Sequence, residues 1–367
     1  MKKLRMVFAV YVVIGSLASL VACSSEAVEQ AETEKQMTEN VNSSETETQE
    51  MGEIYKIRLN TSVAQGTPRS ESADICYAET FKEEVEALSN GAIEVEMYYG
   101  NLLGSDSDVA AGLSNGSIEF LCTDVTTLSS YYEPSMVLSI PGVISSTEEA
   151  EKLFESNWWE NMVEECASSS GIRILGTMSK GFRNFTTVNK PLKTPEDMNG
   201  LTLRVINNPL YIEMVNSLSA NAVPMNVSEL YTALQNGVVD GHENSIPNIL
   251  QDKTYELEKY LVLDAHTGSY FCGMISEKFY QSLPDELKED VNEASKRAQE
   301  ETEKTVEKII SNGLQTLRDN GVEIYEPTDA ELEKWYEAYA DNTLKLAQEE
   351  MGEAVVNDFM KAVENLQ

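Results

Sequence analysis

The sequence predicts an α/β fold of two lobes that is completed by long C-terminal helices. Strand and helix patterns alternate in one run from about residue 54 and in a second run from about residue 172, and the last third of the chain has mainly helical periodicity. Such alternation implies parallel strands joined by right-handed crossovers. Because ligands of such sheets lie beyond the carboxyl ends of the strands, we expect a ligand cleft between the lobes.

The first run has strand–helix–strand–helix–strand order. Its elements are expected at residues 54–59, 69–88, 92–98, 107–113 and 118–122. The opening strand alternates apolar and polar residues. The first helix carries Tyr77, Phe81 and Val85 at helical spacing, which gives it one apolar face. Glycine-containing turns separate these elements, as strand–helix connections require.

The second run begins after a stretch to which the patterns assign no element. Strands are expected at 172–178, 182–188, 201–206 and 222–225, and helical segments at 194–197, 209–218 and 228–234. The turn at 194–197 starts with Thr194 as N-cap and Pro195 at the first helical position, which is a favoured combination. No period of 20–50 residues repeats, which excludes a solenoid.

The C-terminal third is read as helices around one short strand. A helix is expected over 284–320, where Val291 and Ala298 belong to an apolar series at helical spacing, and a strand over 322–325 precedes a helix from Asp329. We therefore predict two lobes at 53–180 and 181–269, completed by about 270–309 and 310–367 respectively. The hinge is expected near 178–181 and 268–271.

The N-terminus has the pattern of a lipoprotein signal. Three basic residues precede an uncharged apolar stretch over 6–22, and small residues stand just before Cys23. Residues 1–22 are predicted to be a signal peptide, and Cys23 to carry the lipid after cleavage. The alternative is an uncleaved signal anchor. Residues 23–52 are rich in Glu, Ser, Thr and Gln, and are predicted to be a disordered tether.

The charge balance limits the possible partners. The chain has 62 acidic and 27 basic residues, which gives a formal net charge of −35 at pH 7. Such a field disfavours nucleic acid and anionic lipid surfaces as partners. It also repels small anions, so a carboxylate ligand would need local, buried cations. Arg183 and Arg204 lie in a stretch with few acids and are the candidates.

Cysteine, histidine and motif patterns give no sign of a metal, a cofactor or catalysis. The cysteines other than Cys23 are Cys76, Cys122, Cys166 and Cys272; they lie in apolar contexts and lack metal-ligand spacing. Buried free thiols are favoured over a disulfide, which remains open for an exported protein. His242 and His266 are interpreted as structural. No nucleophile elbow, phosphate loop or zinc-protease motif is present in the sequence.

One segment, residues 181–248, carries most of the functional information. It combines GFRN at 181–184, GLTLR at 200–204 and DGHEN at 240–244. This succession resembles the solute-binding proteins of tripartite ATP-independent periplasmic (TRAP) transporters. The turn NLLGSD at 101–106 and the motif YELEKYL at 255–261 follow the same family order, so the resemblance extends from about residue 54 to the C-terminus.

The resemblance implies a carboxylate site. Arg204 matches the family arginine that forks onto the ligand carboxylate, Arg183 matches a second basic position, and Asn244 matches an amide that meets the same carboxylate. Each also has a structural alternative: an ion pair for Arg204, a structural or solvated role for Arg183, and a helix cap for Asn244. Val227 stands where many members have an aromatic residue, so no single member's substrate can be transferred.

Further ligand contacts are predicted in the first lobe. Asn60, Gln65, Arg69 and Asp124 follow strands and are therefore candidates for the cleft. A cation at Arg69 would serve the second carboxylate of a dicarboxylate. Its alternative is a solvent-exposed charge at a helix N-terminus.

The resemblance implies a lipid-anchored, extracytoplasmic binding protein without catalytic activity. It would capture an organic acid, with a sugar acid favoured and a C4-dicarboxylate as the alternative, and deliver it as a monomer to TRAP permease subunits in the membrane. A secreted enzyme acting on uronic acids and a sensory ligand-binding lobe are the alternatives from other classes.

Overall fold

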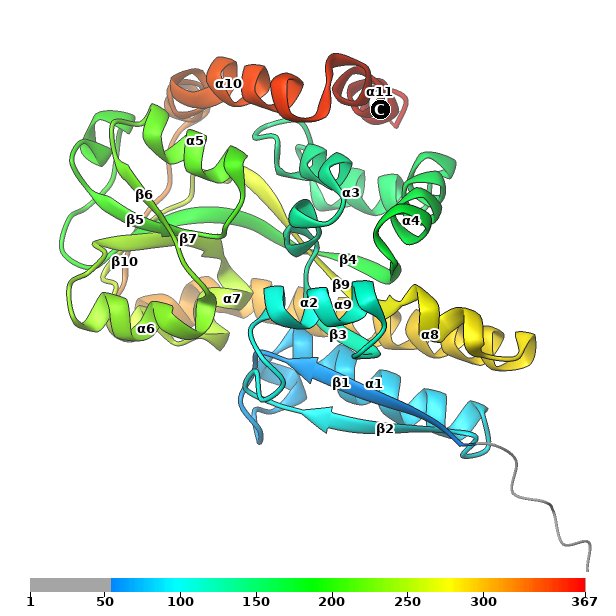
Figure 1. The fold of residues 1–367 in the computed structure, drawn as a ribbon. Coiled ribbons are helices and arrows are strands. Elements are labelled where there is room, and N and C mark those ends of the chain that lie inside the picture. The colour runs from blue at the N-terminus through cyan, green and yellow to red at the C-terminus, as the bar shows by residue number, and fades with distance from the viewer. Residues whose placement is uncertain (1–53, 367) are drawn as a thin grey trace, which may run out of the picture. The chain divides into compact units, whose positions relative to one another are not determined.

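Figure 1 shows a computed structural model that describes residues 54–366. Within these residues the strands form a ten-stranded sheet with the order β2-β1-β3-β9-β4-β7-β5-β6, to which β8 and β10 are added beside β4. The strands are β1 (Tyr55–Thr61), β2 (Ile93–Tyr98), β3 (Phe120–Asp124), β4 (Ile172–Thr187), β5 (Thr202–Val205), β6 (Asn221–Pro224), β7 (Gly241–Ser245), β8 (Tyr260–Val262), β9 (Thr267–Ser276) and β10 (Glu323–Tyr325).

Helices cover this sheet. The α-helices are α1 (Ala73–Leu88), α2 (Asp106–Asn115), α3 (Thr147–Phe154), α4 (Asn157–Ser170), α5 (Pro209–Ser217), α6 (Val227–Gln235), α7 (Ile246–Gln251), α8 (Glu277–Ser282), α9 (Asp285–Asp319), α10 (Asp329–Met351) and α11 (Glu353–Glu364). The 3-10 turns are η1 (Arg69–Glu71), η2 (Val125–Ser130), η3 (Glu133–Ser139), η4 (Pro195–Met198) and η5 (Thr254–Glu256). The predicted α/β class with long C-terminal helices is confirmed.

The first α/β run follows the prediction closely. Strand β1 pairs in parallel with both β2 and β3, as the alternation required. The first helix starts later than predicted, because Ser72 is extended and caps α1 by accepting a hydrogen bond from the Ile75 amide. A capping box of Ser105 and Asp108 fixes the start of α2. These caps place the first turns of both helices beside the cavity described below.

The prediction of two strands at 172–178 and 182–188 was wrong, because they form the single strand β4. It pairs antiparallel with β9, and the pairing shifts register twice, the second time between Ser179 and Phe182. Gly181, at φ +79°, lies within this second shift. Strands β4 and β9 therefore join the strands of the two predicted α/β runs into one sheet. The predicted hinge segments fall on these two strands.

The stretch without predicted elements, residues 125–171, is largely helical. Serine side chains cap both of its α-helices: Ser146 accepts from the Glu149 amide and Ser156 from the Trp159 amide. Buried Trp159, Met162 and Cys166 lie at helical spacing on α4. Strands β7, β8 and β9 were also not predicted, since their antiparallel partners lie far away in the sequence.

Long helices connect several hydrophobic clusters. Val291 and Ala298 of α9 pack in the cluster of α1 and β1–β3, whereas Leu317 of the same helix packs with Ile246 of α7. Trp335 of α10 is fully buried against β5 and α5. In α11, Phe359 packs in the cluster that contains α3 and α4. The C-terminal helices thus bridge the predicted lobe boundaries, and those boundaries remain a prediction.

Two other sequence predictions can be followed in the described residues. All four cysteines of that part of the chain, Cys76, Cys122, Cys166 and Cys272, are buried free thiols, as favoured. Burial raises the pKa of the Cys166 thiol to about 11, so it stays protonated at neutral pH. In residues 54–366, every helix is too short or too polar to be a candidate membrane span.

Candidate ligand-binding site

A cavity of about 610 Å³ lies at the carboxyl ends of parallel strands, where the sequence predicted a cleft. Strands β3, β5 and β6 contribute residues at or just after their last positions, namely Asp124, Ile206 and Met225. Hydroxyl and amide side chains make up much of the remaining lining; examples are Ser62, Ser105, Thr127, Asn207, Asn226 and Gln251. A lining of this composition suits a polar, hydroxylated molecule.

Arg204 is a buried cation without a counter-ion. It lies on β5, is 3% exposed and lines the cavity. Its Nε donates to the Met225 carbonyl oxygen at 2.9 Å, and none of the described carboxylates is within ion-pair distance. Burial lowers the pKa of Arg204 to about 10, partly opposed by Glu243, so the side chain remains charged at neutral pH. A buried, uncompensated charge of this kind calls for an anionic ligand.

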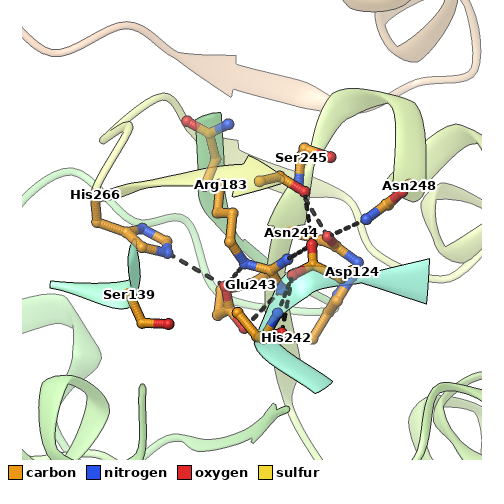
Figure 2. A network of polar contacts seen from close by, with 12 residues as sticks. Asp124, Ser139, Arg183, His242, Glu243, Asn244, Ser245, Asn248 and His266 are labelled. Atoms are coloured by element: carbon orange, nitrogen blue, oxygen red, sulfur yellow. Dashed lines mark hydrogen bonds and ion pairs between the residues drawn. The ribbon is translucent and has the colours of Figure 1, made fainter. Parts of the chain in front are cut away.

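Arg183 also lines the cavity, but its charge is compensated within the protein (Figure 2). Its Nε and Nη2 donate to the two carboxylate oxygens of Glu243 at 2.5 and 2.9 Å. Its Nη1 lies 3.8 Å from an Asp124 oxygen and makes no hydrogen bond within residues 54–366. The guanidinium also stacks over the ring of Tyr211 at 5.3 Å. Arg183 therefore has a structural role and keeps one free donor.

Glu243 connects Arg183 to a buried histidine that the sequence did not place in the site. His266 approaches Glu243 through Nε2 at 3.3 Å and Asp264 through Nδ1 at 2.7 Å. Burial works against the charged form of Glu243, but Arg183 and His266 outweigh it and lower its pKa to about 2. Burial likewise opposes the charge of His266, yet Asp264 and Glu243 raise its pKa to about 9. The network fixes the orientation of Arg183.

The raised pKa of His266 predicts a pH-dependent stability. A group with a higher pKa in the folded state contributes stability below its unfolded pKa and loses that contribution as the pH rises through the folded pKa. For His266 the contribution is complete below about pH 6.5 and disappears toward pH 9. Urea unfolding of the wild type and His266→Gln across this range should give a free-energy difference that shrinks as pH rises. A difference that stays constant with pH would contradict a charged His266.

Asn244 lines the cavity and keeps its amide nitrogen free of hydrogen bonds within the described residues. Its Oδ1 accepts from the Ser245 amide at 3.0 Å and from Asn248 Nδ2 at 2.8 Å (Figure 2). The helix-cap alternative does not hold, because Ser245 occupies the N-cap position of α7. Asn244 thus supplies a free donor near the two arginines.

The four ligand contacts predicted in the first lobe differ in whether they line the cavity. Asp124 lines the cavity, and its carboxylate caps η2 through the Thr126 amide at 3.1 Å. Asn60, Gln65 and Arg69 lie outside the lining. Asn60 is buried and donates to Asn101, whereas Gln65 is exposed.

Arg69 is engaged by acids of α1. It pairs with Glu79 at 2.6 Å and hydrogen-bonds Glu83 through Nη1 at 2.9 Å. Its charge is therefore already compensated on the surface, outside the cavity lining. The position after a strand indicated the right edge of the sheet, but it did not reveal which acids lie nearby.

Six charged residues of the lining were not among the ligand contacts predicted from the sequence: Lys180, Asp74, Asp106, Asp108, Glu229 and Asp252. Strand alternation would put Lys180 and Arg183 on opposite faces. The irregular pairing between Ser179 and Phe182 changes this, and both residues line the cavity. Among the acids, Asp74, Asp106 and Asp252 stand at helix ends, and nothing in an acid-rich sequence distinguished them.

A two-lobed α/β fold with a polar cavity that contains an unpaired arginine at the strand ends is that of an extracytoplasmic solute-binding protein. The chain belongs to the bacterial extracellular solute-binding proteins, family 7, whose model matches residues 63–350. The predicted TRAP relationship is thereby confirmed. The members compared below are binding proteins of transport systems.

Relatives and solved structures agree with this assignment. The C4-dicarboxylate-binding protein DctB of Bacillus subtilis is 26% identical over 74% of this chain and 77% of its own length. A TRAP solute-binding protein of a Sulfitobacter species, solved with β-D-galacturonate, is 26% identical with a TM-score of 0.78, over 84% of this chain and 99% of that one. The sugar acid-binding protein of Advenella mimigardefordensis, solved with galactonate, is 25% identical with a TM-score of 0.80, over 86% and 99%.

Proposed function

We propose that the protein captures an organic acid by its carboxylate and delivers it to TRAP permease subunits. The observation that carries the proposal is Arg204, which is buried, charged and without a counter-ion in residues 54–366. A guanidinium fork binds a carboxylate through two parallel charge-assisted hydrogen bonds. The free Nη1 of Arg183 and the free Nδ2 of Asn244 supply further donors. A thermal-shift screen of organic acids, each beside its neutral amide, tests this, because only the acids should stabilise the protein.

The favoured ligand is a sugar acid. The cavity of about 610 Å³ offers many hydroxyl and amide groups that can pair with the hydroxyl groups of a sugar acid. Two of the similar structures hold galacturonate and galactonate, whereas the Bacillus subtilis relative is a C4-dicarboxylate-binding protein. Val227, which stands where many family members have an aromatic residue, lines the cavity.

Binding is expected to close the protein, which we propose acts as a monomer with lobes at 53–180 and 181–269. The proposed hinge segments, 178–181 and 268–271, fall on β4 and β9, which connect the two ends of the sheet. A ligand that contacts both lobes favours the closed state. Small-angle X-ray scattering should therefore give a smaller radius of gyration with saturating ligand. Arg204→Ala with the same ligand is the control and should show no change; an unchanged wild type with proven binding would argue against closure.

We further propose a lipid anchor on Cys23, which lies outside the described residues. The basic, apolar and small-residue pattern before Cys23 supports it, and residues 23–52 would form the tether. Cys23→Ala should leave the signal uncleaved or release the protein from the membrane, as membrane fractionation and mass spectrometry can show. Processing and membrane retention equal to those of the wild type would disprove the anchor.

A further inference from the structure

The cavity carries more negative than positive side chains. Six acidic residues line it in the described chain, among them Asp74, Asp106 and Asp252, against the cations Lys180, Arg183 and Arg204. Two of the cations are already neutralised. Arg183 pairs with Glu243, and Lys180 pairs with Asp74 at 2.9 Å. Of these three cations, Arg204 alone has no counter-ion in the described residues. The cavity can therefore balance one negative charge of a ligand.

Four of the six acids form no ion pair within residues 54–366: the partly exposed Asp106 and Asp252, and the exposed Asp108 and Glu229. Asp106 opens α2, and its Oδ2 accepts from the Thr123 hydroxyl at 2.6 Å. Its Oδ1 is buried and has no hydrogen-bond partner in residues 54–366. Asp252 is the C-cap of α7 and makes no ion pair in the same part of the chain. Burial raises the pKa of both carboxyls to about 6, as expected where no close cation compensates them.

The carboxylates of Asp106 and Asp252 line the cavity without a cation in the described residues, and a carboxylate can accept hydrogen bonds from ligand hydroxyl groups. A second ligand carboxylate brings only acceptors and adds a like charge beside Asp106, Asp252 and the Asp74–Lys180 pair. The single charge of Lys180 is already balanced by Asp74, so the surroundings of Asp106 and Asp252 stay net negative.

We propose that Asp106 and Asp252 determine specificity by charge: they accept hydroxyl groups of a monocarboxylate and reject a second carboxylate. The inference rests on the proposed function, since it presumes that the ligand carboxylate binds Arg204. Specificity of this kind comes from a repulsive element as much as from an attractive one.

The test uses ligand pairs that differ only at one end. An aldonate ends in a hydroxymethyl group where the matching aldarate has a carboxylate, as in galactonate and galactarate or gluconate and glucarate. Calorimetry at pH 8, where Asp106 and Asp252 are ionised, should show the wild type binding the preferred aldonate at least about tenfold tighter than its aldarate. Asp106→Asn, Asp252→Asn and the double variant should lower this ratio, with improved aldarate binding. Asp341→Asn, which removes an exposed charge of α10, is the matched control and should leave it unchanged.

Each outcome decides the proposal. Aldarates could bind as tightly as aldonates, with Arg204→Ala abolishing the binding of both. The proposed role of Asp106 and Asp252 in specificity would then be wrong, whereas the proposed binding of a carboxylate by Arg204 would still hold. The role in specificity is equally wrong if the asparagine variants, shown by their melting curves to be folded, keep the wild-type ratio of aldonate to aldarate affinity. Binding of succinate or malate without any aldonate would also overturn it. If no acid binds in an Arg204-dependent manner, the proposed function itself fails.

Discussion

Replacing Arg204 by alanine is expected to nearly abolish binding of the cognate acid. The guanidinium is the open cation of the cavity, and its removal would leave the ligand carboxylate in a buried site without its main partner. Truncating one partner of a buried charge pair costs roughly 2–5 kcal/mol. This corresponds to roughly 30- to several-thousand-fold in affinity. Arg204→Lys should also weaken binding, because an ammonium keeps the charge but cannot fork.

Isothermal titration calorimetry with the tightest acid from the screen measures this effect. Arg58→Ala is a suitable control, since Arg58 pairs with Glu119 at 2.6 Å outside the cavity and should leave the affinity unchanged. The amide of the same acid should fail on the wild type. An Arg204→Ala variant that binds as tightly as the wild type would refute the proposed carboxylate site.

Glu243→Gln is expected to cause the largest loss of stability. The carboxylate is fully buried and is shared by Arg183 and His266, so its removal leaves an inadequately paired buried guanidinium. Breaking a buried ion pair from one side costs about 3–5 kcal/mol. The low pKa of Glu243, about 2, means that the pair is intact at neutral pH and that its contribution is lost as the pH falls from about 4.5 toward 2.

Urea unfolding at pH 7 checks this loss. Glu301→Gln serves as the control, because Glu301 forms an exposed pair with Lys304 and such pairs contribute at most about 1 kcal/mol. If the two variants lose similar stability, the network around Arg183 does not support the fold as argued. Ligand affinity of Glu243→Gln should also fall, since Arg183 would lose its fixed orientation.

The sequence predicted those strands and helices whose formation is marked by regular short-range periodicity. Strand β1 and helix α1 were found because their periodicities are regular, and both belong to parallel strand–helix units with short connections. The division of β4 into two strands failed because Gly181 and the irregular pairing around it look like a turn in the sequence. Strand β9 was missed, since all its residues are buried and its partners lie about 90 to 150 residues away.

Sequence motifs identified some residues of the site. Residues whose position depends on pairing between strands distant in the sequence could not be predicted. Arg204 and Asn244 were found by motif spacing, and both line the cavity. The pairing of Arg183 with Glu243 depends on the register of β4 with β7, which no local pattern reveals. Lys180 was missed for the same kind of reason, because a register shift turns it toward the cavity.

The most direct test of the account is a crystal structure of the protein with the tightest acid identified by the screen. The account predicts a ligand carboxylate within hydrogen-bond distance of the Arg204 guanidinium, with the Asn244 amide and Arg183 Nη1 as further donors. A ligand whose carboxylate lies elsewhere, for example on Lys180, with Arg204 left without an anionic partner, would contradict it.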